Sequence, residues 1–143
     1  MRRLDDLVVG ERLLVGRTTP SREEAIELAR RFEPQPYHVD EEAARQSIYG
    51  GLTLCSLHLF AIATRLFFDM EEPIATLAML GKDEVRLPRP ARPGEELRYF
   101  TTCIEKRASR SKPDRGVVVL QDEIVNPRDE AVLTQKVTLL VAR

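Results

Sequence analysis

The sequence predicts an α+β fold in which an antiparallel β-sheet wraps around one long central helix. Three observations carry this prediction. Apolar residues occupy most sides of a helical stretch from Thr53 to Asp69, and a helix with that pattern is enclosed by protein. Four stretches rich in β-branched residues follow it, separated by short turns, as in an antiparallel sheet. The chain has 143 residues, 43% of them hydrophobic, which fits one domain, residues 1–143, with its own core.

The first expected element is a strand from Glu11 to Thr19, because its middle is apolar and β-branched. A helix follows it. Ser21, with Glu24 three residues later, fits a capping box at the start of this helix. We expect the helix to end at Glu33, because Pro34 disfavours helical geometry in the residue before it.

The next stretch, residues 34–37 (PQPY), is expected to form a stiff extended loop, because its two prolines fix the backbone and lack N–H donors. Asp40 then caps a short helix over Glu41–Gln46. Gly50 and Gly51 break the chain before the long helix. Strands are expected at Ile74–Leu87, with a polar interruption at Gly81–Asp83, and at Glu96–Lys106, Gly116–Val125 and Ala131–Val141.

Composition excludes several classes of partner. The 22 basic and 23 acidic residues give a net charge of −1, so neither nucleic acid nor a membrane surface is expected. The longest apolar stretch, Leu52–Phe68, contains polar residues and fits a buried helix better than a membrane span. No signal peptide is visible and the two cysteines lack metal-ligand spacing, so reduced thiols and a cytoplasmic location are expected. The sequence predicts no metal or redox cofactor, because it lacks a phosphate-binding glycine loop and a metal-ligand cluster.

A carboxylate and an imidazole flank the Pro-Gln-Pro-Tyr stretch, at Glu33 and His38. Together these groups can take protons from one water molecule and give them back. Residues five apart in an extended chain point to opposite faces, so the two side chains converge only if the loop bends. The alternative is an exposed glutamate at a helix end and an unrelated loop histidine.

The stretch FEPQPYHVDEEAARQSIYGGL, residues 32–52, resembles the MaoC-like acyl dehydratases, which include the (R)-specific enoyl-CoA hydratases and have the hotdog fold. The family pattern is an Asp followed five residues later by a His, often as Asp-Pro-Gln-Pro-Phe-His. Here the corresponding stretch runs from Glu33 to His38. The likeness resumes over residues 85–95 and 109–116, so it extends over nearly the whole chain.

This resemblance implies a hydro-lyase that adds or removes water across the α,β double bond of an acyl thioester, an enoyl-CoA or 3-hydroxyacyl-CoA. Glu33 and His38 would hold the water, and the backbone N–H of Ser56 would polarise the thioester carbonyl. It further implies a homodimer or higher homo-oligomer, because the sheet leaves open edges and this fold usually pairs them. Residues expected to contact the acyl-CoA are Gln35, Tyr37, Tyr49, Gly50, Gly51, Arg86 and Arg110.

Two positions depart from the family pattern. Glu33 replaces the usual Asp, and Cys55-Ser56 stands where hydratases often have His-Gly or Ser-Gly. The resemblance predicts that Asp at position 33 keeps or raises activity. Two other functions remain open at this point, because fold does not separate them. One is a hotdog acyl-CoA thioesterase, in which the carboxylate activates water against the thioester carbonyl. The other is a non-catalytic acyl-thioester-binding protein.

Some further residues allow two interpretations. His58 is either a core or interface histidine or part of an acyl tunnel. Two basic loops, one with Arg86, Arg89 and Arg92 and one over residues 107–115, either bind CoA phosphates or form solvated turns with internal ion pairs. Cys55 and Cys103 fit buried small hydrophobes better than nucleophiles.

Overall fold

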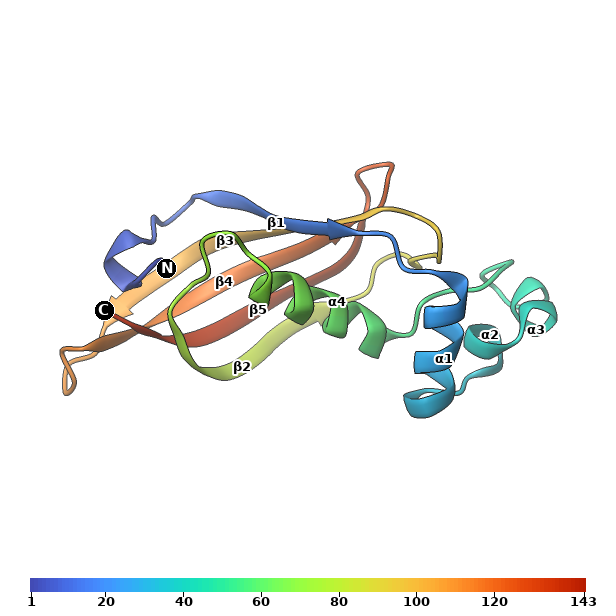
Figure 1. The fold of residues 1–143 in the computed structure, drawn as a ribbon, viewed down its shortest axis with the longest axis horizontal. Helices are drawn as coiled ribbons and strands as arrows, with labels where there is room; N and C mark the ends of the chain where they lie inside the picture. Colours follow the sequence, from blue (N-terminus) through green and yellow to red (C-terminus); the bar gives the residue numbers. More distant parts are fainter.

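A computed structural model describes residues 1–143 and contains one five-stranded antiparallel sheet in the order β1-β3-β4-β5-β2. Figure 1 shows this long sheet with the helix α4 (Ser56–Phe68) lying along one of its faces. The predicted α+β arrangement of a sheet around a central helix is therefore confirmed. The strands are β1 (Arg12–Thr18), β2 (Thr76–Arg86), β3 (Leu97–Ala108), β4 (Arg115–Val125) and β5 (Ala131–Ala142).

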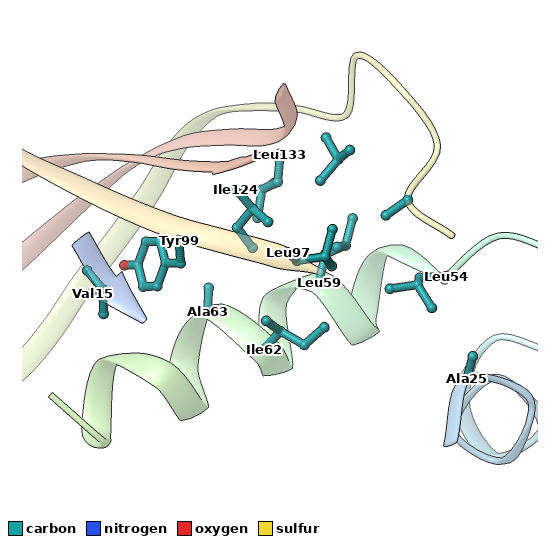
Figure 2. Packing of buried hydrophobic residues seen from close by; sticks show 12 residues of the cluster. Val15, Ala25, Leu54, Leu59, Ile62, Ala63, Leu97, Tyr99, Ile124 and Leu133 are labelled. Carbon is teal, nitrogen blue, oxygen red and sulfur yellow. The ribbon is translucent and has the colours of Figure 1, made fainter. Parts of the chain in front are cut away.

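The main core lies between α4 and the sheet (Figure 2). Leu59, Ile62 and Ala63 of α4 belong to one buried apolar cluster with side chains of β1, β3, β4 and β5. Gly16 of β1 lets the strand come close to the helix, because a Cβ there would lie 3.1 Å from Cδ2 of Leu66. A second apolar cluster fills the other half of the sheet, where the 3-10 turn η1 (Leu4–Asp6) covers it.

A row of polar side chains crosses the sheet, and three of its members, Thr101, Asp122 and Gln135, are buried. Asp122 of β4 accepts hydrogen bonds from the Thr101 hydroxyl of β3 at 2.8 Å and from the Gln135 amide of β5 at 2.9 Å. Lys82 of β2 donates to the side-chain carbonyl oxygen of Gln135 at 3.3 Å. Burial raises the pKa of Asp122 above its usual range, although its hydrogen bonds oppose the shift. The row ties four strands together beneath α4.

Three helices stand at one end of the sheet, namely α1 (Arg22–Phe32), α2 (Pro36–Val39) and α3 (Glu41–Arg45) (Figure 1). Two of them begin at caps that the sequence predicts. Ser21 accepts a hydrogen bond from the backbone N–H of Glu24 at 3.1 Å, and Asp40 accepts one from Ala43 at 2.7 Å. These caps fix where α1 and α3 begin.

Three expectations from the sequence need correction. Residues 34–37 do not form an extended loop, because α2 begins at Pro36, whose fixed φ suits a first helical position. Gly81–Asp83 does not interrupt its strand, since β2 runs through it with shifts in its register against β5. The chain does not enclose α4 on all sides. Leu57 and Phe68 are 42% and 72% exposed, because a single sheet covers only one side of the helix.

Candidate active site

Glu33 and His38 lie close together where the helices α1 and α2 meet. Glu33 is the C-terminal cap of α1, which ends before Pro34. The turn of α2 then brings His38 back toward it, so that Nε2 of His38 lies 4.0 Å from Oε1 of Glu33. The imidazole is 7% exposed and the carboxylate side chain 33%. The bend that the hypothesis requires comes from Pro36, the first residue of α2.

The second ring nitrogen of His38 determines which tautomer the neutral imidazole adopts. Nδ1 lies 2.7 Å from the backbone carbonyl oxygen of Thr53 and 3.1 Å from the hydroxyl of the same residue. A carbonyl oxygen only accepts hydrogen bonds, so Nδ1 carries the proton and donates it. Nε2 of the neutral ring is therefore a bare acceptor, and it is the atom that faces Glu33.

The site thus presents two acceptors to the same small space. Nε2 of His38 and the ionised carboxylate of Glu33 cannot hydrogen-bond to each other, because neither has a proton to donate. A water molecule with hydrogen bonds of about 2.8 Å to each atom spans their 4.0 Å separation. Such a water donates both of its hydrogens and keeps its lone pairs for another atom.

The start of α4 forms the other side of this space. Ser56 is the first helical residue, and the first N–H groups of a helix have no intrahelical partner. No backbone carbonyl accepts the N–H of Ser56 elsewhere in the chain, so it can donate to a ligand. The hydroxyl of Ser56 donates to Oε2 of Glu33 at 3.3 Å. The positive end of the α4 dipole therefore lies beside the carboxylate.

A cavity of about 400 Å³ opens onto the pair. The rings of Tyr37 and Tyr49 stand 5.2 Å apart at their centroids on one wall. Leu54 and Leu59 of the α4 region line another part. The remaining lining residues are Glu33, His38, Thr53, Ser56, Leu87, Pro88, Arg89, Pro90 and Ala91. The cavity combines a few polar groups with an apolar wall, as small-molecule sites do.

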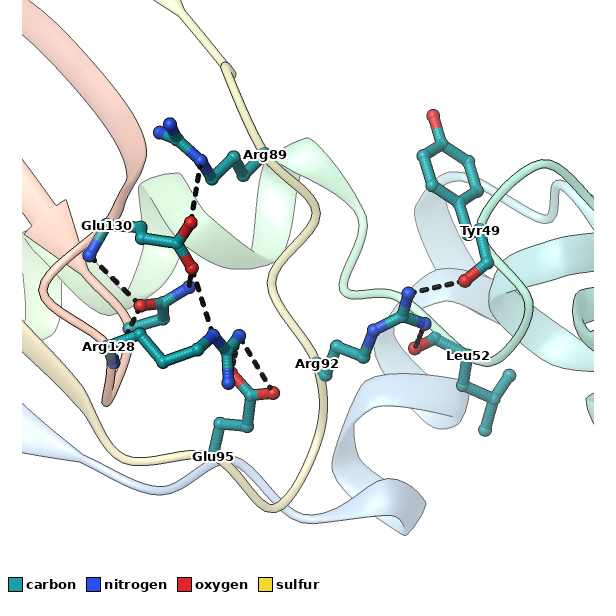
Figure 3. Close-up of polar contacts among 8 residues, drawn as sticks. Tyr49, Leu52, Arg89, Arg92, Glu95, Arg128 and Glu130 are labelled. Carbon is teal, nitrogen blue, oxygen red and sulfur yellow. Dashed lines mark hydrogen bonds and ion pairs between the residues drawn. The ribbon is translucent and has the colours of Figure 1, made fainter.

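Arg92 fixes the loop that carries Tyr49 (Figure 3). Its guanidinium donates to the carbonyl oxygens of Tyr49 and Leu52, the latter at 3.4 Å. Gly51 leaves room for it, because a Cβ there would lie 3.2 Å from Nη1 of Arg92. Gly50 has φ +65°, which favours glycine. The two glycines therefore shape this loop, and Arg92 holds it in place.

The structure brings together only part of the predicted site. Glu33, His38, Ser56, Tyr37 and Tyr49 all line the one cavity. Other predicted contacts do not line it, and their substrate-binding role stays a prediction. This second group consists of Gln35, Gly50, Gly51, Arg86 and Arg110.

Each of these residues has a different place in the chain. Gln35 is exposed, and its backbone shapes the start of α2. Gly50 and Gly51 line a neighbouring groove. Arg86 is exposed at the end of β2. Arg110 lies in the β3–β4 turn, at the opposite end of the sheet from α1–α3 (Figure 1).

Two residues that organise the site have roles that the sequence did not predict. Thr53 orients the His38 ring through its carbonyl, and no pattern in the sequence marks a backbone carbonyl for this role. Arg92 fixes the Tyr49 loop, whereas the sequence suggested only a phosphate ligand or a solvated turn with internal ion pairs. Arg89 of the same basic loop lines the cavity and pairs with Glu130 at 3.1 Å (Figure 3). These two arginines of the loop are thus bound to partners elsewhere in the chain.

Three further residues prove to be buried. His58 is 1% exposed, and neither ring nitrogen has a hydrogen-bond partner. Its Nε2 faces Glu24 at 3.7 Å, away from the cavity. Burial lowers the pKa of His58 and raises the pKa of both Cys55 and Cys103. The interpretation of the cysteines as small buried hydrophobes agrees with this placement.

Comparison with known proteins assigns the family. Residues 8–124 match the profile described as the MaoC like domain, which is most of the chain. The chain belongs to the MaoC-like dehydratase family. This MaoC-like chain has the hotdog fold of its structural relatives, as the resemblance predicted. None of its helices has the length and apolar character needed to cross a membrane.

Individual relatives differ in how close they are. A MaoC-like dehydratase from Rhodospirillum rubrum is 38% identical and superposes with a TM-score of 0.93, over 100% of this chain and 98% of that one. The unliganded R-hydratase PhaJ1 from Pseudomonas aeruginosa shares the fold, with 16% identity, a TM-score of 0.79 and coverage of 97% and 84%. The uncharacterized protein YdeM of Bacillus subtilis is 22% identical over 99% of both chains.

Proposed function

We propose that this MaoC-like protein is a hydro-lyase that adds or removes water across the α,β double bond of an acyl thioester, with enoyl-CoA and 3-hydroxyacyl-CoA as the substrate pair. The observation that carries the proposal is the pair of acceptors, Nε2 of His38 and Oε1 of Glu33, 4.0 Å apart on the wall of an open cavity. Family membership supports the reaction class. The whole chain acts as one domain in this proposal.

The two acceptors define the chemistry at the water molecule. A water held between them donates one hydrogen to each, so its lone pair is free to attack the β-carbon of the enoyl group. As the O–C bond forms, one of its protons passes to the pair. The pair then returns a proton to the α-carbon, and no net proton is gained or lost. Dehydration follows the same steps in reverse.

The start of α4 supplies the second requirement of the reaction. Negative charge develops on the thioester oxygen when the α-carbon becomes nucleophilic, and a preorganised N–H donor stabilises that charge. In the proposal, the backbone N–H of Ser56 is this donor, because it is unpaired and lies at the positive end of a 13-residue helix. The same residue thereby lies next to both the carboxylate and the acyl group.

The test uses purified protein with crotonyl-CoA. Loss of the conjugated thioester absorbance, with 3-hydroxybutyryl-CoA as product and no free thiol, is the expected result. Glu33→Gln and His38→Gln should each lower kcat by about 10²-fold or more, because each removes a basic group that can take a proton from the water. Glu27→Gln is the matched control, since Glu27 is an exposed glutamate on the same helix. Full activity of either site variant would remove that residue from the mechanism.

The same assay separates the other candidate functions. Release of free CoA would identify a thioesterase, in which the Glu33 carboxylate directs water at the thioester carbonyl. An unchanged acyl-CoA that raises the melting temperature would identify a binding protein without catalysis. Either outcome would overturn the hydro-lyase proposal.

We further propose that the protein is a homodimer joined along β2. This strand is at the edge of the sheet, and Leu77, Met79 and Leu80 are each more than half exposed. The exposed apolar side of α4, with Leu57 and Phe68, adds to the uncovered surface. An open edge strand with apolar side chains pairs readily with another chain. A second copy would cover these residues. The cytoplasmic location expected from the sequence is a separate expectation, and it remains a prediction.

Light scattering on a size-exclusion column tests this assembly. The wild-type protein should elute as a dimer, and Leu80→Glu should shift it toward the monomer because it places a charge in the buried contact. Leu14→Glu is the matched control, since Leu14 is an exposed leucine on β1 at the opposite edge. A wild-type monomer at every concentration would contradict the proposal.

A further inference from the structure

The Glu33 carboxylate has one hydrogen-bond partner within the chain, and that partner is a side chain. The hydroxyl of Ser56 donates to Oε2 of Glu33 at 3.3 Å. The other carboxylate oxygen, Oε1, faces His38 at 4.0 Å, which is too far for a direct hydrogen bond. This contact links the end of α1 to the start of α4, 23 residues later in the chain.

A glutamate needs such a contact because its side chain is long. It has one more rotatable bond than an aspartate, and a free carboxylate at a helix end samples several orientations. Reaction rates fall steeply when a reacting group is misplaced by about 1 Å. A hydrogen bond to Oε2 reduces this freedom and leaves Oε1 directed at the space beside His38.

Ser56 is placed to do this without losing its other donor. Its hydroxyl donates a hydrogen bond to the Glu33 carboxylate, while its backbone N–H, the first of α4, stays unpaired. The two donors of this residue are therefore available to two different acceptors, the Glu33 carboxylate and a ligand. A glycine at this position would offer the backbone donor alone.

We propose that the Ser56 hydroxyl positions the Glu33 carboxylate, so that the glutamate and the serine work as a matched pair. This inference rests on the proposed hydration reaction. Ser56 acts through Glu33 in this role and does not exchange protons with the substrate. The hydroxyl sets the orientation of Oε1, and Oε1 holds the water.

The first test compares Ser56→Ala with Ser56→Thr in the crotonyl-CoA assay. Ser56→Ala should lower kcat about tenfold or more, the effect of one lost hydrogen bond to a charged group. Its KM should change less than about twofold, because the apolar residues that line the cavity are unchanged. Ser56→Thr keeps the hydroxyl and should restore most of kcat. Equal kcat values for the two variants would overturn the inference.

The second test is a double-mutant cycle with Glu33→Asp. An aspartate carboxylate sits about one C–C bond, about 1.5 Å, further back and no longer reaches the hydroxyl. Ser56→Ala should therefore cost much less in the Glu33→Asp background than in the wild type. An equal loss in both backgrounds would show that the serine acts on the helix itself, and the inference would fall.

The outcomes for the two proposals are distinguishable. If the wild type does not hydrate crotonyl-CoA, or if Glu33→Gln is fully active, the proposed function fails. If the wild type is active and Glu33→Gln is not, but Ser56→Ala equals the wild type in kcat, only the positioning role fails.

Discussion

Shortening the carboxylate at position 33 gives the sharpest test of the site geometry. Glu33→Asp removes one methylene and withdraws the carboxylate by up to about 1.5 Å. The separation between the carboxylate and Nε2 of His38 then grows from 4.0 Å to about 5.5 Å. A water with hydrogen bonds of about 2.8 Å reaches both atoms across that gap only if it lies almost on the line between them. Its two O–H bonds diverge at a much smaller angle, so it keeps one of the two bonds.

We therefore expect kcat of Glu33→Asp to fall by about 10- to 100-fold, the range for a reacting group displaced by about 1 Å. The KM for crotonyl-CoA should stay within about threefold, because the remaining cavity wall is intact. The resemblance to the family predicts that activity is kept or raised, since the substitution restores the usual Asp. Steady-state hydration rates decide between the two, with Glu27→Asp on the exposed side of α1 as control. A kcat equal to or above that of the wild type would refute the geometric argument.

The remaining predictions concern stability and the cavity wall. Burial lowers the pKa of His58 in the folded protein. As the pH falls, His58 is therefore protonated in the unfolded chain at a higher pH than in the folded one, and the free energy of unfolding declines below about pH 6.5. His58→Leu should weaken that decline in denaturant titrations at several pH values, and an unchanged pH dependence would contradict this. Asp122→Ala leaves two buried donors without an acceptor and should lower the free energy of unfolding by about 2–3 kcal/mol, whereas exposed Asp114→Ala should not. Arg92→Ala releases the loop that carries Tyr49 and should raise KM more than it lowers kcat. An unchanged KM would mean that the loop holds its position without the arginine.

Local sequence signals predicted most of the secondary structure. Ser21 and Asp40 cap their helices as the side chains at those positions predict. The strands β3, β4 and β5 lie within two residues of the expected limits. Such features depend on neighbouring residues, and these are visible in the sequence. The extended loop at residues 34–37 was wrong because proline supports two conformations, and the sequence does not show which one the surroundings select.

The pair formed by Glu33 and His38 was identified from its chemistry and from the family pattern, but its geometry was not. Their convergence depends on the turn of α2 and on the Thr53 carbonyl. The sequence did not indicate that the Ser56 hydroxyl bonds to Glu33. A hydrogen bond between residues 23 positions apart leaves no periodic signal in a single sequence.

The sequence by itself determined the fold class, the order of the elements and the two groups of the candidate site. The fold class and the order of the elements follow from periodicity and capping, which act over a few neighbours in the chain. The two groups of the site follow from residue type together with the family pattern. The tertiary structure alone decided which groups meet: the 4.0 Å gap of the pair, the hydroxyl beside the carboxylate and the arginine that holds the Tyr49 loop. Contacts between distant segments arise from the packing of helices on the sheet. Because packing sums many weak contacts across the whole chain, no single stretch of residues encodes it.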